Sequence, residues 1–351
     1  MGDEQWRLGR RSGLDGLRAI AIVLVVVSHS KAPHVLIFGS EGVAMFFVLS
    51  GFLITTLLLD ERDATGSYSI GRFYVRRFLR LMPALWAAVA LAVSAELAVH
   101  GGIADWALIL GAITYTSNFV MMDGTWPHAT PLTQTWSLGI EEQFYLLWPL
   151  ALLLAARFPK RWAVLTLAWA SVLSAWLTIV VFHSGSTDGH YYFGLDVRLN
   201  QLLGGAALAV ALRFTTNRNV SQWWALPSIV AVVAVGAYRP TFFIAVIVAV
   251  LIIPALYVAS HSDAGWLSTR PMVCIGRRSY GLYLYHVPIR YLILGLFPAA
   301  AWWWAGPLTL ALGLAVADVS YRWLESPFLR LKSRLGSPSR QQPVTAIPAH
   351  I

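Results

Sequence analysis

An arginine and a histidine stand eleven residues apart in GLDGLRAIAIVLVVVSHS, the apolar stretch that covers residues 13–30. A helix advances about 100° per residue, so the side chains of Arg18 and His29 point the same way, roughly 16 Å apart along the axis. Asp15 lies one turn before Arg18 on the same face. His29 could be a neutral imidazole that hydrogen-bonds between helices, but the shared face favours a polar channel along the helix.

A second polar face occurs in TWSLGIEEQFYLLWP, residues 135–149. Ser137, Glu141 and Tyr145 follow one another at intervals of four residues, which places them on one side of a helix. Glu142 lies about 100° away around the same helix. A glutamate so placed could hold the ring N–H of a histidine and favour its charged form. The alternative is a structural ion pair with an arginine of a neighbouring helix.

Four arginines are concentrated in GRFYVRRFLRLMP, residues 71–83. Arg77 and Arg80 are about one helical turn apart, and Arg72 and Arg76 lie close by. Guanidinium groups at this spacing suit a phosphate-bearing ligand, because each can donate two parallel hydrogen bonds. Arginines at a membrane surface also serve as topology signals or lipid-headgroup anchors, so the spacing leaves both interpretations open.

The composition indicates a membrane protein built from helices. The chain of 351 residues is 57% hydrophobic and only 12% charged, whereas soluble domains are about 25% charged. Apolar stretches of spanning length recur along most of the sequence. The single cysteine, Cys274, excludes an internal disulfide and a multi-cysteine metal site, and we predict no metal. An ionisable side chain within such a stretch costs about 2.5–3.5 kcal/mol at the bilayer centre, and is therefore a functional candidate.

We predict an all-α polytopic protein of about ten membrane spans. The segments are 14–32, 36–59, 81–100, 136–156, 162–182, 197–213, 222–238, 241–260, 279–297 and 300–323. With both termini cytoplasmic, 22 of the 26 lysines and arginines fall in inner segments, as the positive-inside rule requires. The residues left outside are Lys31, Arg198, Arg239 and Arg290. Arg198 sits at the outer end of a span, which suggests that it meets an anion or a carboxylate.

Other segments complete this organisation. An eleventh span at 103–122 would invert every later loop, so we expect 101–135 to be a re-entrant or surface segment after the third span. We expect one transmembrane domain over 1–331 and a disordered cytoplasmic tail over 332–351, which is polar and rich in proline. Ser50 and Gly51 are small enough to permit close helix approach. His286 and Glu325 are interpreted as structural.

Seven motifs in order resemble the acyltransferase-3 family of integral membrane acyltransferases over about residues 11–332. They are LDGLRAIAIVLVVVSHS, FFVLSGFLI, RRFLRLMP, TWSLGIEEQFYLLWP, RLNQLLGGAALA, SYGLYLYHVPI and YRWLESPF. The resemblance implies transfer of an acyl group, most often acetyl, from cytoplasmic acyl-CoA to a hydroxyl of a carbohydrate, glycolipid or glycosylated natural product. Acyl-CoA is then a co-substrate, with no permanently bound cofactor, and the location is the bacterial cytoplasmic membrane.

The resemblance also assigns residue roles. Arg18 and His29 match the family's arginine and histidine, which have ten residues between them. Arg77 and Arg80 match the family's Arg-x-x-Arg pair. Glu141 matches the glutamate of the family's SLxxE motif. The nucleotide phosphates would then meet Arg77 and Arg80, with Arg76 and Arg18 as further candidates.

The deeper residues would carry the chemistry. His29 would act as general base, and Glu141 would orient its ring. Arg198, Tyr145 and Ser137 are candidates for contacts with the acceptor or the oxyanion. Ser30, beside His29, and Ser137 are candidate nucleophiles, so a mechanism with an acyl-enzyme intermediate stays open. The non-enzyme alternative is a transporter or flippase of a polar or glycosylated substrate, since intramembrane charges also mark substrate pathways.

Overall fold

The computed structural model describes most of the chain. The described residues are 6, 8–9, 11–30, 39–103, 105–122, 130–155, 160–183, 189–216, 220–238, 244–262 and 265–334. They form helices and their connections, with no strand in this part of the chain. The predicted all-α class is therefore confirmed.

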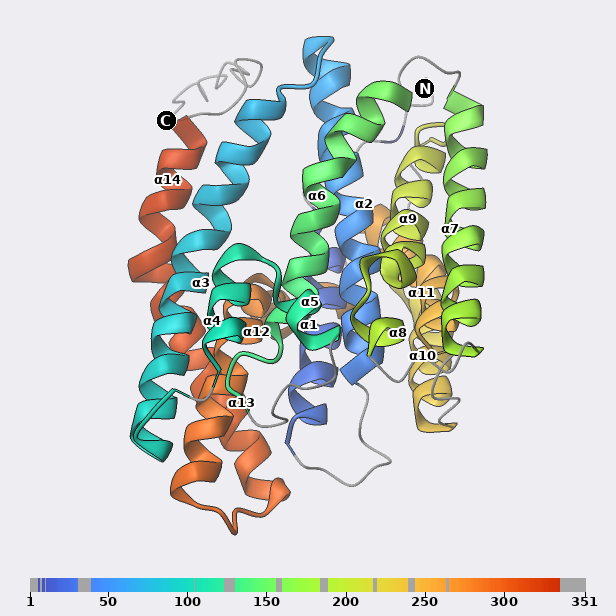
Figure 1. Ribbon diagram of the computed structural model, residues 1–351. Coiled ribbons are helices and arrows are strands. Elements are labelled where there is room, and N and C mark those ends of the chain that lie inside the picture. Colours follow the sequence, from blue (N-terminus) through green and yellow to red (C-terminus); the bar gives the residue numbers. More distant parts are fainter. Residues whose placement is uncertain are drawn as a thin grey trace, which may run out of the picture.

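Long helices make up the body of the molecule (Figure 1). They are α1 (Ser12–Ser28), α2 (Gly39–Thr65), α3 (Ile70–His100), α6 (Thr135–Ala155), α7 (Lys160–His183), α9 (Leu195–Leu212), α10 (Leu226–Tyr238), α11 (Ile244–His261), α12 (Arg270–Leu296) and α13 (Trp302–Val319). The shorter helices are α4 (Trp106–Thr114), α5 (Ser117–Met122), α8 (His190–Phe193) and α14 (Ser326–Arg334). Two 3-10 turns, η2 (Gln222–Ala225) and η3 (Trp266–Ser268), and a π-helical turn, η4 (Ser320–Glu325), connect them.

Each of the ten predicted spans falls on one of these long helices. Within the described ranges, four stretches are long and apolar enough to cross a membrane: Gly39–Thr65, Ile70–His100, Leu195–Leu212 and Trp302–Leu331. The number of spans and the side of each terminus stay predictions. The third helix begins at Ile70 rather than near residue 81, because the arginine-rich segment continues the apolar helix without a break. The predicted tail overlaps α14 at 332–334, and residues 335–351 lie outside the described residues.

The segment after α3 contains only short helices where it is described. Helix α4 has 9 residues and α5 has 6, which at 1.5 Å per residue is far less than the roughly 30 Å hydrocarbon core. Tyr115 separates them in a left-handed conformation (φ 58°). This agrees with the prediction that the segment is not a continuous span; residues 104 and 123–129 lie outside the described part.

Helices α2 and α9 pack at very short range. A Cβ on Gly51 would overlap the carbonyl oxygen of Leu202, and a Cβ on Gly205 would overlap that of Val48. Side chains at these two positions would force the backbones apart, so glycine is needed on both helices. The predicted close approach at Gly51 is confirmed.

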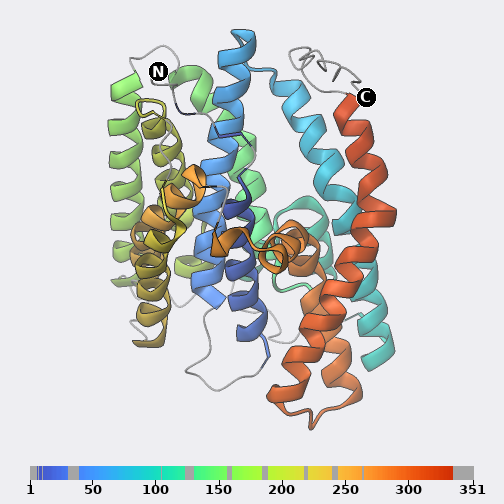
Figure 2. The ribbon, with the colours of Figure 1, turned by 180° about the vertical axis from the view of Figure 1, so that it is seen from behind.

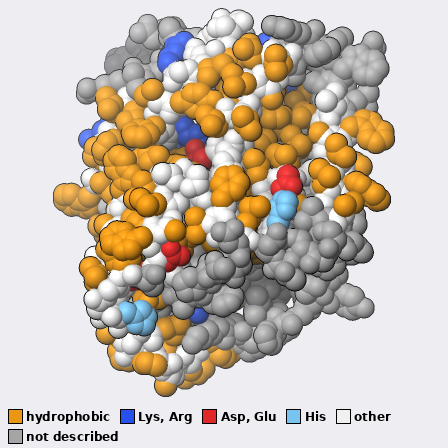
Figure 3. All heavy atoms as spheres, viewed as in Figure 1, with side chains coloured by type: hydrophobic (Ala, Val, Ile, Leu, Met, Phe, Trp, Pro, Cys, Tyr) orange, Lys and Arg blue, Asp and Glu red, His pale blue; other side chains and the backbone are white. Residues whose placement is uncertain are grey.

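Helix α1 lies inside the bundle, against α2, α11 and α12 (Figures 1 and 2). Its central position explains why a polar stripe on this helix meets other protein helices rather than lipid. The outward faces of other helices are apolar: Leu150 of α6 is 48% exposed, and Trp169 and Trp176 of α7 are 73% and 60% exposed. The described surface in Figure 3 is accordingly mostly hydrophobic, with few charged side chains. The protein is a multi-pass membrane protein.

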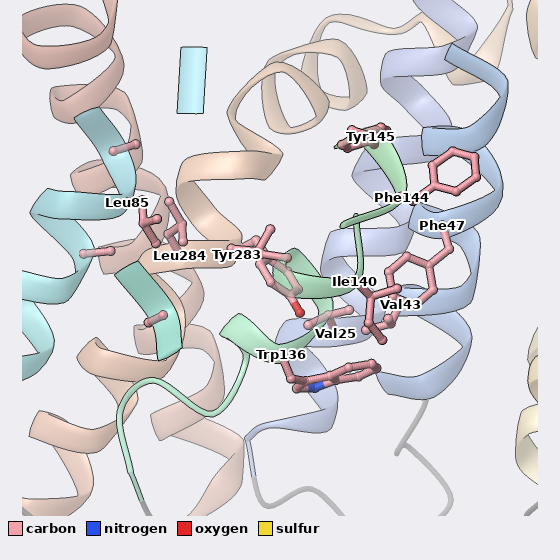
Figure 4. Close-up of a cluster of buried hydrophobic side chains, with 14 of the residues drawn as sticks. Val25, Val43, Phe47, Leu85, Trp136, Ile140, Phe144, Tyr145, Tyr283 and Leu284 are labelled. Atoms are coloured by element: carbon pink, nitrogen blue, oxygen red, sulfur yellow. The ribbon is translucent and has the colours of Figure 1, made fainter. Parts of the chain in front are cut away.

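A buried apolar cluster holds α1, α2, α6 and α12 together. Val25 of α1, Phe47 of α2, Ile140 of α6 and Tyr283 of α12 all belong to it (Figure 4). This cluster determines how deep the polar residues of the four helices lie relative to one another.

Candidate functional site

His29 follows the last residue of α1 and is half-buried. Its Nδ1 lies 2.8 Å from the carbonyl oxygen of Val25, one turn earlier. A carbonyl can only accept a hydrogen bond, so Nδ1 carries the proton and donates it. Nε2 of the neutral ring then bears a lone pair. The local helix geometry therefore presents His29 in the tautomer that can take a proton at Nε2.

A second histidine faces His29 from α12. The ring centroids of His29 and His286 are 5.0 Å apart, with the rings inclined at 73°. His286 is fully buried, and its Nδ1 lies 2.8 Å from the carbonyl oxygen of Tyr283, which fixes the same tautomer as in His29. Its Nε2 is buried without a hydrogen-bond partner among the described residues. The interpretation of His286 as structural did not include this contact with His29. The signal in the sequence was a histidine in the outer part of a predicted span.

Arg290 is close to both rings. It lies one turn beyond His286 on α12, and both histidines are within electrostatic range of its charge. Tyr283, His286 and Arg290 share one face of α12, the helix that packs against α1. We refer to His29, His286 and Arg290 as the histidine centre.

A second polar group, the arginine cluster, consists of Arg18, Arg77, Arg80, Glu141 and Glu142. Its members come from α1, α3 and α6. Arg18 lies within electrostatic range of Arg80 and of Glu141, and Arg77 within range of both Arg80 and Glu141. The structure thus unites residues that the sequence placed in three separate motifs. Along α1, about 16 Å of helix joins this cluster to His29.

Arg77 is held by Glu142. Its Nε lies 2.9 and 3.0 Å from the two carboxylate oxygens, and its Nη2 lies 2.7 Å from Oε1. The guanidinium also covers the ring of Tyr145, 3.3 Å from its centroid. A structural ion pair was the alternative interpretation of this region, but the partner is Glu142 rather than Glu141. Arg76 is paired as well, with Glu61 at 3.0 Å.

Arg18 and Arg80 are the arginines of the cluster for which the structure shows no hydrogen-bonded carboxylate among the described residues. Arg80 is exposed and Arg18 is half-buried, so both are accessible. Glu325 lies within electrostatic range of Arg80. Two adjacent guanidinium groups repel each other unless an anion lies between them. Arg77 and Arg76 are occupied by Glu142 and Glu61, so Arg18 and Arg80 are the better candidates for an anion.

Among the described residues Glu141 shows no contact with His29, although the motifs predicted one. Its surroundings are Arg77, Ser50, Glu142 and Arg18, and Ser50 is within hydrogen-bonding reach of its carboxylate. The ring of His29 is oriented by the backbone of its own helix instead. The physical reason is depth: the SLxxE segment meets α1 near Arg18, about eleven residues before the histidine. Glu141 belongs to the arginine cluster.

The remaining candidates already have partners. Ser137 Oγ lies 2.5 Å from the hydroxyl of Tyr283, which donates to the carbonyl of Gln134. Ser30 donates to the carbonyl of Val27. These contacts favour packing roles for both serines.

Arg198 donates from Nε to the carbonyl of Tyr192 and covers that ring, 4.6 Å from its centroid. It is buried on α9.

Helix α12 lacks one backbone hydrogen bond beside this site, because it contains a proline. Pro288 lacks an N–H, so the carbonyl of Leu284 loses its helical partner. The side-chain amide of Gln134, just before α6, donates to that oxygen at 3.0 Å. This bond fixes the start of α6 against the middle of α12. Among the described residues, no three His, Cys, Asp or Glu side chains gather to hold a metal ion.

Comparison with known proteins agrees with the motifs. A family model described as an acyltransferase domain matches residues 11–322. The chain is 32% identical over 353 residues to O-acetyltransferase OatA of Staphylococcus aureus (strain NCTC 8325 / PS 47), covering 90% of this chain and 56% of the relative. It is 30% identical over 357 residues to peptidoglycan O-acetyltransferase OatA of Listeria monocytogenes serovar 1/2a, covering 90% and 55%.

The chain spans about half the length of the curated relatives that it matches. No solved structure shows significant similarity to it. The family match covers nearly the whole chain and contains both polar groups described above. The chain therefore belongs to the acyltransferase-3 family.

Proposed function

We propose that this protein is a membrane O-acyltransferase that moves an acyl group, most simply acetyl, from acyl-CoA to a hydroxyl of a carbohydrate-containing acceptor. The observation that carries the proposal is the tautomer of His29: its Nδ1–H is held by Val25, which leaves the Nε2 lone pair as a base. The names of the relatives, which are O-acetyltransferases, support the reaction class.

The donor would bind at the arginine cluster. Arg18 and Arg80 are adjacent and accessible, which suits the phosphates of the nucleotide. The pantetheine arm would then extend along α1 toward His29, over the roughly 16 Å that separate Arg18 from the histidine. Arg77 would stabilise the cluster through Glu142 rather than bind the donor directly.

The reaction balances with His29 as the only base. The acceptor oxygen bonds to the thioester carbon as its proton passes to Nε2 of His29. The tetrahedral intermediate collapses, the C–S bond breaks, and the CoA thiolate takes up the proton from the imidazolium. No acyl-enzyme is needed, which agrees with the internal hydrogen bonds of Ser30 and Ser137.

The name of one relative supports a choice of acceptor. Because one of them is named a peptidoglycan O-acetyltransferase, we propose a glycan of the cell envelope as the first acceptor to test. The protein would then act in the bacterial cytoplasmic membrane, with the acceptor reaching His29 from the outer side.

The test uses the purified protein in nanodiscs with radiolabelled acetyl-CoA. We expect His29→Ala to bind acetyl-CoA but lose turnover by about 10²–10⁴-fold, the usual contribution of a positioned base. The double variant Arg18→Gln/Arg80→Gln should lose binding. The control is Arg322→Gln, since Arg322 is largely exposed and pairs with Asp318. Native protein that does not bind acetyl-CoA would refute the donor assignment and favour a transporter or flippase.

A further inference from the structure

Arg290 is an intramembrane arginine that neither the motifs nor the donor site explain. It was one of four basic residues left outside the inner segments. The structure places it in α12, half-buried, with its Nε buried and without a hydrogen-bond partner among the described residues. An arginine that only anchors a helix end extends its guanidinium to the membrane surface, and its inner nitrogen need not be enclosed. Arg290 instead lies one turn from His286 on α12, within electrostatic range of both imidazoles.

The histidine centre also contains an unused acceptor. His286 is fully buried, its Nδ1–H is held by Tyr283, and its Nε2 has no partner among the described residues. A buried imidazole nitrogen without a partner can receive a hydrogen bond from a bound molecule. Arg290, one turn further along α12, has a donor without a partner in the described part of the chain, and the ring of His286 lies 5.0 Å from that of His29. This combination indicates that a polar ligand binds here.

The reaction requires a group that stabilises negative charge on the carbonyl oxygen, and a guanidinium does this with both charge and hydrogen-bond donors. When the acceptor oxygen adds to the acyl carbon, the carbonyl oxygen acquires a full negative charge, which must be stabilised in a site largely shielded from water. Arg198 was a candidate, but its Nε is engaged with the backbone of Tyr192. Among the described residues, Arg290 lies within electrostatic range of His29.

We propose that Arg290 is a further catalytic residue, whose guanidinium stabilises the oxyanion of the tetrahedral intermediate while His29 holds the proton of the attacking hydroxyl. This inference rests on the proposed acyltransferase function. The C–O bond forms, the electron pair of the C=O bond moves to the oxygen beside Arg290, and it returns when the C–S bond breaks. Water can replace the acceptor hydroxyl, in which case acetyl-CoA is hydrolysed through the same oxyanion.

Because transfer and hydrolysis pass through the same oxyanion, measuring both reactions distinguishes an oxyanion role of Arg290 from two simpler roles. If Arg290 only bound the acceptor, its loss would lower transfer and leave hydrolysis unchanged. If it only anchored α12, its loss would lower the thermal stability of the protein and would not lower kcat in the fraction that stays folded. An oxyanion residue must affect kcat for both reactions with little change in the Kd of acetyl-CoA.

The experiment measures acetyl-CoA binding, acceptor-independent hydrolysis and thermal unfolding in nanodiscs for the native protein, Arg290→Gln and Arg290→Lys. We expect Arg290→Gln to lower kcat for hydrolysis by about 10²–10³-fold with an unchanged Kd, and Arg290→Lys to keep part of the activity because the charge remains. If Arg290→Gln does not fold, Arg290→Lys alone tests the same kcat-against-Kd split. The matched control is His261→Gln in α11, because His261 also bonds its own helix through Nδ1 and has an unpartnered Nε2.

The outcomes distinguish the two proposals. Native protein that neither binds nor hydrolyses acetyl-CoA refutes the proposed function and this inference with it. Native protein that is active, together with an Arg290→Gln variant that hydrolyses acetyl-CoA at the native rate, refutes the oxyanion role and leaves the acyltransferase intact. A loss confined to Kd likewise overturns the proposal, since it would make Arg290 a donor-binding residue.

Discussion

The ion pair between Arg77 and Glu142 offers the sharpest test of how the arginine cluster works. Three N–H···O contacts of 2.7 to 3.0 Å join the two side chains, which are only 17% and 19% exposed. Removing one member of a buried pair costs about 3–5 kcal/mol, because the other charge stays buried without a partner. Glu142→Gln keeps one oxygen acceptor, so we expect the lower end of that range, about 3 kcal/mol.

The assay is unfolding by SDS in mixed micelles, followed by circular dichroism, for Glu142→Gln, Arg77→Gln and the double variant. The double variant should be less destabilised than the sum of the two, by about 1–3 kcal/mol. The control is Asp196→Asn, which removes the carboxylate that lies 3.0 Å from His190 and is 47% exposed; there we expect less than about 1 kcal/mol.

Ligand binding adds a second measurement to the same variants. If Arg77 is structural, Arg77→Gln that remains folded should bind acetyl-CoA more tightly than Arg80→Gln. The reasoning would be refuted if Glu142→Gln left stability unchanged while Arg77→Gln abolished binding. In that case Arg77 would be the phosphate ligand, and the contact with Glu142 would not matter for the fold.

The remaining predictions concern packing and catalysis. Gly51→Ala should destabilise the protein by about 3 kcal/mol or more, because the new methyl overlaps the backbone of Leu202. Gly71 in α3 has open space around it, so Gly71→Ala should be neutral or stabilising by up to about 1 kcal/mol. SDS unfolding of the two variants tests the difference. Tyr283→Phe should cost about 1–3 kcal/mol in the same assay, since it leaves buried acceptors unpaired, and an unchanged unfolding midpoint would contradict this. His29→Gln, which offers no basic ring nitrogen, should be as inactive in acetyl transfer as His29→Ala; a rate near the native one would show that His29 is not the base.

The spacing of apolar and polar residues within single segments predicted the helices and some of their polar faces. The composition indicated a helical membrane protein, and the apolar segments located every long helix to within a few residues, apart from the early starts of α3 and α12 and the late end of α2. The face shared by Arg18 and His29 also follows from the period of a single helix. The small residues Ser50 and Gly51 also predicted a close approach of another helix, because a glycine within an apolar helix indicates close packing whichever helix lies against it.

The pairings between helices could not be predicted in the same way. Glu141 and Glu142 are adjacent in the sequence, and the 100° between them decides which one meets Arg77. That choice depends on how α6 is rotated and how deep it lies against α3, and both are determined by apolar packing around residues such as Phe144 and Trp148. For the same reason the structure places Glu141 beside Arg77, Ser50 and Arg18, and its expected role in orienting His29 stays a prediction.

The helices, their apolar lengths and the polar stripe of α1 can be read from the order of the amino acids, since each depends on contacts or hydrogen bonds within one segment. The packing of the helices brings His286 and Arg290 to the end of α1 that carries His29, pairs Glu142 with Arg77, and places Arg18 within electrostatic range of Arg80. These residues come from helices far apart in the chain, and their meeting depends on the relative depth and rotation of whole helices, which no periodicity within one helix specifies.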